Sequence, residues 1–109
     1  MSEVRLLIVA ADPLARAGLA TLLAELPGLV VAGRTAGGDE LAAELDVYRP
    51  DVVVWDLGWE PEESLSQLGE LAAELEAGRP PIVALLGDEE QAAAAWSAGA
   101  RGLLLRNAD

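Results

Sequence analysis

One aspartate at the end of an apolar run is the residue of this sequence that is best placed to do chemistry. Asp56 directly follows Val52-Val53-Val54-Trp55, a run that is typical of a strand buried on both faces of a parallel sheet. Open α/β sheets place their reactive groups at the carboxyl ends of such strands. A carboxylate there can act as an acceptor or as a ligand where charged partners assist it. The chain has no histidine, and all seven of its basic residues are arginine, so the usual partners are missing.

Composition excludes several other chemistries. Without histidine the chain cannot hold a Ser, His and Asp catalytic set, and without cysteine it has no disulfide and no thiolate metal site. The segment 10–13 offers neither glycine nor hydroxyl groups for a phosphate-binding loop. A net charge of −12, from 19 acidic and 7 basic residues, disfavours direct nucleic-acid binding. An enzyme with its own turnover is therefore the least expected function.

Five short apolar segments alternate with helical patterns and predict an α/β fold. The apolar segments lie at 6–9, 29–32, 52–55, 82–86 and 102–105. The first helix should begin at Asp12-Pro13, with Asp12 as its N-cap. Its expected inner stripe is Ala15, Leu19, Leu22 and Leu26. The other helical patterns begin near Gly38-Asp39, centre on 65–75, and run from Asp88 to about Ala98.

The chain has the size of one domain, spanning 1–109, without repeats or linkers. It has no apolar run of bilayer length and no basic region of a secretion signal at its start. A cytoplasmic location is the expectation. Right-handed crossovers should place helices on both faces of a parallel sheet.

Three separated motifs resemble response-regulator receiver domains, most closely the group attached to a LuxR-type helix-turn-helix. The motifs are 7–14 (LIVAADPL) followed by Arg16, Gly18 and Leu19, then 49–56 (RPDVVVWD), and then 98–106 (AGARGLLLR). The resemblance implies a flavodoxin-like (CheY-like) three-layer sandwich with a five-stranded parallel sheet in the order 2-1-3-4-5. That family moves a phosphoryl group from a histidine kinase to an aspartate with the help of magnesium.

Carried over to this chain, the resemblance makes Asp56 the phosphoacceptor and finds the other reactive positions altered. The two metal-binding acids fall on Ala10 and Ala11, the switch hydroxyl on Leu86, the switch aromatic on Leu103, and the lysine on Arg106. Magnesium coordinates oxygen atoms and usually needs carboxylates, so its binding should be lost or weak. Asp56, Asp12 and the carbonyl of Gly58 are the weak remaining candidates, and capping is the preferred role for Asp12.

Two further expectations concern the state of this site. Arg106 either pairs with Asp56, holding the domain in one state, or lies over the surface without a specific partner. Leu86 and Leu103 are both apolar and should stay buried, which predicts a domain without a phosphorylation-driven switch.

The tryptophans and the end of the chain bear on partners. Trp55 should pack between sheet and helix, whereas Trp59 and Trp96 either pack or face a partner. The family continues with a fifth helix, for which no room remains before Asp109, so parts of 82–86 and 103–105 should be open to water as an uncovered apolar patch. An excised fragment of a longer regulator and a short form that dimerises are the two explanations.

The leading interpretation is an atypical receiver domain that regulates transcription by protein contacts or homodimerisation, independently of phosphorylation. No effector domain is expected within 1–109. One alternative is a sensor that binds a metabolite in the pocket lined by Ala10, Ala11, Asp56 and Leu86. Another is a receiver that is still phosphorylated on Asp56 by a histidine kinase.

Overall fold

Five parallel strands form one sheet in the order β2-β1-β3-β4-β5. The computed structural model describes residues 3–38, 41–58, 61–75, 77 and 79–105. In chain order the elements are β1 (Val4–Ala10), α1 (Pro13–Ala24), β2 (Leu29–Thr35), α2 (Leu41–Tyr48), β3 (Val52–Asp56), α3 (Pro61–Glu74), β4 (Ile82–Leu86), the 3-10 helix η2 (Glu89–Gln91), α4 (Ala92–Ala98) and β5 (Gly102–Leu105). The predicted fold class and strand order are confirmed.

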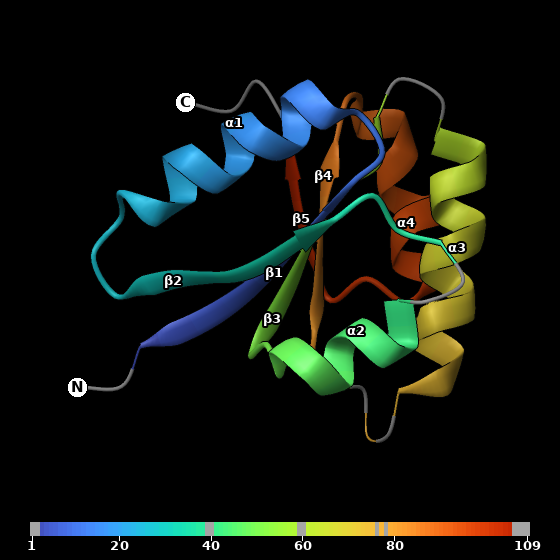
Figure 1. Ribbon diagram of the computed structural model, residues 1–109. Helices are drawn as coiled ribbons and strands as arrows, with labels where there is room; N and C mark the ends of the chain where they lie inside the picture. Colours follow the sequence, from blue (N-terminus) through green and yellow to red (C-terminus); the bar gives the residue numbers. More distant parts are fainter. Residues whose placement is uncertain (1–2, 39–40, 59–60, 76, 78, 106–109) are drawn as a thin grey trace.

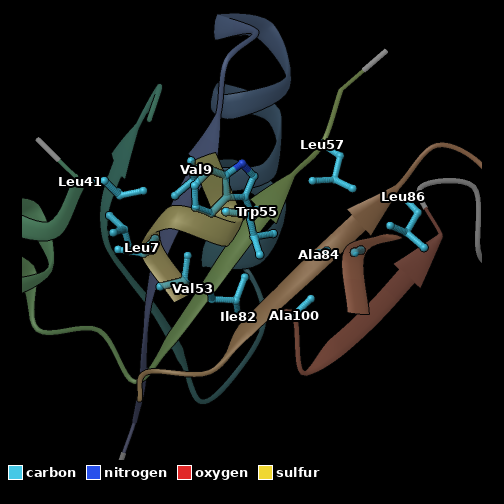
Figure 2. Close-up of a cluster of buried hydrophobic side chains, with 13 residues drawn as sticks. Leu7, Val9, Leu41, Val53, Trp55, Leu57, Ile82, Ala84, Leu86 and Ala100 are labelled. Atoms are coloured by element: carbon cyan, nitrogen blue, oxygen red, sulfur yellow. The ribbon is translucent and has the colours of Figure 1, made fainter. Parts of the chain in front are cut away.

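The helices lie on both faces of the sheet and make a three-layer arrangement. Figure 1 shows α1 over one face and α2, α3 and α4 over the other. Successive side chains of a strand point to opposite faces of the sheet. Because helices cover both faces, the strands are apolar on both sides. The larger cluster, on the side of α2 to α4, includes Leu7, Val53, Trp55 and Ile82 (Figure 2). A smaller cluster, beneath α1, is built on Leu6, Val54 and Leu85.

Helix α1 begins as predicted but turns a different face to the sheet. Asp12 caps it, and Leu19 and Leu23 pack on the smaller cluster. Leu22 is 64% exposed and Leu26 is also exposed, so the predicted inner stripe was wrong at these two positions. The cause is that α1 is apolar around most of its circumference, so its periodicity does not select one stripe.

The segment after β4 is helical but starts more tightly than predicted. Asp88 accepts a hydrogen bond from the amide of Glu90 and caps the 3-10 turn η2, and α4 begins only at Ala92. Gly99 ends α4 with φ of 127°, a conformation that favours glycine. None of the helices within the described residues has the length and apolarity that a bilayer crossing requires.

Gly99 should be intolerant of even one added methyl group. A Cβ at this position would overlap the Cβ of Ala72 on α3, and the positive φ adds backbone strain. We expect Gly99→Ala to lower the free energy of unfolding by about 2–4 kcal/mol in urea denaturation. Gly18→Ala is the matched control, since its Cβ would meet no atom within 4 Å. In mid-helix this control should stabilise by about 0.5–1 kcal/mol, and equal effects of the two substitutions would contradict the packing argument.

Candidate functional site

The carboxyl ends of β1, β3 and β4 bring Asp56 into a buried, apolar edge of the sheet. Asp56 pairs in register with Ala10 on one side and with Leu85 on the other. Asp56 is 2% exposed, and among the residues that the structure describes it is the one charged residue that is buried. The amide of Gly58 donates a hydrogen bond of 3.4 Å to Oδ1 of Asp56. A buried carboxylate needs such donors or a positive charge, because burial without them is costly.

The positions that the resemblance assigns to metal-binding acids carry methyl groups beside this carboxylate. Ala10 is fully buried, and Ala11 is exposed just beyond the end of β1. Within the described residues, no group of three or more acidic side chains could hold a metal ion. Magnesium prefers near-octahedral oxygen coordination, so this donor set does not fit it. The expectation of lost or weak magnesium binding stays a prediction.

Two residues at the start of α1 have roles that the structure makes explicit. Oδ1 of Asp12 accepts a hydrogen bond of 3.1 Å from the amide of Leu14, which is the predicted cap. Nη1 of Arg16 donates a hydrogen bond of 2.8 Å to the carbonyl of Ala10. Since Ala10 is the sheet neighbour of Asp56, Arg16 brings a positive charge to this strand end. No role was predicted for Arg16, although it closely follows the first motif.

The two predicted switch positions differ in burial. Leu86 is buried at the end of β4, as expected for an apolar side chain there. Leu103 on β5 is 37% exposed, so the expectation that it stays buried was wrong. β5 is an edge strand, and its partly exposed side chains follow from having one sheet neighbour. Arg106 and Trp59, with the roles predicted for them, lie outside the described residues.

The remaining tryptophans behave differently from each other. Trp55 lies in the larger cluster and is 2% exposed, as predicted (Figure 2). Trp96 on α4 is 55% exposed, and the guanidinium of Arg101 lies 5.7 Å from its ring centroid. Trp96 is thus available at the surface, and its role in an interface stays a prediction.

A cavity of about 480 Å³ lies next to the site, on the α3 side of β3. Its walls come from the end of β1, the loop after β2, the end of β3 and the first turns of α3: Ala11, Asp12, Ala36, Gly37, Gly38, Trp55, Leu57, Gly58, Glu62, Glu63, Ser64 and Gln67. The predicted metabolite pocket shares only Ala11 with it. Gly37 has a φ of 95°, a conformation that favours glycine at this wall of the cavity.

Comparisons with known proteins find bacterial response regulators that are similar to this chain. The chain is 30% identical over 105 residues to the nitrate/nitrite response regulator NarL of Escherichia coli K12, covering 94% of this chain and 47% of NarL. It thus spans about half the length of the curated relatives it matches. No protein-family model matches the sequence.

Two solved structures show the same fold. One is a LuxR-family two-component response regulator from Aurantimonas, with a TM-score of 0.82 and 24% identity over 99% of this chain and 77% of that one. The other is a receiver domain from Mycobacterium tuberculosis that carries the name NarL, with a TM-score of 0.77 and 22% identity over 100% of this chain and 88% of that one.

The capping role of Asp12 is separable from a metal-binding role by substitution. Asp12→Ala removes the acceptor for the Leu14 amide and should lower the free energy of unfolding by about 1 kcal/mol. Asp12→Asn keeps an acceptor oxygen and should change stability little. Urea denaturation with and without magnesium measures both effects. A stabilisation of the natural protein by magnesium that both variants lose would contradict the capping assignment.

Proposed function

We propose that this chain, which belongs to the response-regulator receiver domains of the LuxR/NarL type, controls its partner proteins without accepting a phosphoryl group. Its place in two-component signalling follows from the family. The observation that carries the proposal is the pairing of Asp56 with Ala10 in the sheet, since a methyl group stands where a cation-holding acid is expected. Transcription control by the intact protein and a cytoplasmic location are parts of the same proposal.

The chemistry of phosphoryl transfer supports this reading. Catalysis of that reaction is mostly positioning and neutralisation of charge on the transferred group. The Leu86 side chain has no hydrogen-bond donor to offer to a phosphoryl oxygen. Glu62 and Glu63 in the first turn of α3 add negative charge on the neighbouring side. Each of these features disfavours a phosphorylated Asp56.

Treatment with acetyl phosphate and magnesium tests the proposal directly. We expect no increase in intact mass for the natural protein, because no acid pair holds the metal beside Asp56. The variant Ala10→Asp/Ala11→Asp restores that pair and should gain magnesium binding, measured by calorimetry. A gain of one phosphate by the natural protein that is lost in Asp56→Asn would refute the proposal and establish the phosphorylatable receiver instead.

Protein contacts are the alternative means of signalling, and one face of the domain suits them. The segments α1, β4 and β5 contain none of the chain's 19 acidic residues. Leu22 and Leu104 are exposed on them, and Leu104 pairs in register with Leu85 of the cluster beneath α1. Two copies with net charge −12 can approach each other here without close contact between acids. We therefore include homodimerisation through this face in the proposal.

Sedimentation equilibrium over a range of concentrations tests the dimer. We expect reversible self-association, and the double variant Leu22→Gln/Leu104→Gln should weaken it about tenfold or more, because two buried leucines are lost from the interface. Val47→Gln is the control, since Val47 is exposed on α2, on the other face of the sheet. A monomer at all concentrations, or equal weakening by the control, would remove the dimer from the proposal.

A further inference from the structure

We propose that the cavity beside Trp55 is a binding site for a small organic cation that also carries a neutral hydrogen-bond acceptor, such as a hydroxyl, ether or carbonyl oxygen. The inference goes beyond the proposed function and does not depend on whether Asp56 accepts a phosphoryl group. It gives the domain a chemical signal of its own.

The size and position of the cavity suit a metabolite. Its volume of about 480 Å³ lies within the usual range for small-molecule sites and holds roughly fifteen non-hydrogen atoms. It opens at the carboxyl ends of β1 and β3, the edge where open α/β sheets bind ligands. Ala11, Ala36 and Leu57 supply apolar wall, and the loop glycines let backbone approach closely.

The charge of the lining selects a cation. Asp12, Glu62 and Glu63 line the cavity, and its described lining includes no basic residue. Phosphates and carboxylates would therefore be repelled. A metal ion is a poor fit as well, because no three acidic side chains of the described residues come close enough to share one. Acids spread around a space of this volume match an ammonium or guanidinium group carried on a carbon framework better than a bare metal ion.

The indole of Trp55 supplies the second, independent indication of a ligand. The side chain is 2% exposed, yet its N–H has no hydrogen-bond partner among the described residues. Among the described residues, every side-chain nitrogen or oxygen that is fully enclosed has a hydrogen-bond partner. The indole nitrogen must therefore touch open space, and Trp55 lines the cavity. Figure 2 shows this nitrogen on the side of the ring toward the carboxyl ends of the strands.

An unpaired donor inside an acidic cavity defines the ligand more narrowly than charge alone. A tryptophan N–H can only donate, so the ligand must present an acceptor to it. The neighbouring carboxylates disfavour an anionic acceptor, which leaves a neutral oxygen. An amino sugar or an amino alcohol has both the cationic group and the neutral oxygen.

Nuclear magnetic resonance offers a direct readout, because the chain has three tryptophans and so three indole N–H signals. The Trp55 signal is identified by its loss in Trp55→Phe. Titration with glucosamine or 1-amino-2-propanol should shift this signal for at least one probe below about 10 mM, while the Trp96 signal stays in place. N-acetylglucosamine, which has the ring oxygens without the charge, should leave the Trp55 signal unmoved.

Charge variants make the inference falsifiable without altering the core. Glu62→Gln/Glu63→Gln should raise the dissociation constant about tenfold. Glu89→Gln/Glu90→Gln, with two exposed acids outside the cavity lining, should leave it unchanged. The inference is overturned if no cationic probe moves the Trp55 signal, or if N-acetylglucosamine also moves it. It is equally overturned if magnesium alone reproduces the shift, or if the two double variants change the dissociation constant alike. No phosphoryl donor is present, so this outcome is independent of the acetyl phosphate experiment.

Discussion

The burial of one carboxylate is the constraint around which the functional edge of this domain is arranged. Asp56 lies between Ala10 and Leu85 in the sheet, in a place where water cannot solvate it. A buried carboxyl group needs hydrogen-bond donors within the protein, and the Gly58 amide is one of them. Arg16 holds a further positive charge at the adjacent strand end.

The same sheet explains why the altered residues leave the fold intact. Ala10 at the end of β1 and Leu86 at the end of β4 are buried, like the other apolar residues of their strands. Such substitutions remove oxygen ligands and donors without opening a hole in the core. The chemistry of the edge and the stability of the fold are therefore separable, and a receiver can lose the first while it keeps the second.

The sequence predicts the strands well, because each apolar run is short, continuous and bounded by turn residues, whereas the order of the strands is implied by the family resemblance. It predicts helix faces less well. The apolar residues of α1 lie on several sides, and only packing against Leu6 and Val54 selects Leu19 and Leu23 over Leu22. The cavity could not be predicted, since Gly37, Trp55 and Gln67 come from separate elements that the fold brings together. Leu103 was misjudged because an edge strand has one neighbour rather than two.

Trp55 and Asp56 are neighbours in β3 and so connect the cavity with the buried carboxylate. Adjacent strand residues point to opposite faces, so the indole lines the cavity on the α3 side while the carboxylate lies on the side of α1. A ligand that draws the Trp55 N–H toward itself acts on backbone that the two residues share. Coupling between sites requires a structural element that both sites bias, and the end of β3 is the element that touches both. A ligand bound beside Trp55 would therefore act on the same strand end that carries Asp56.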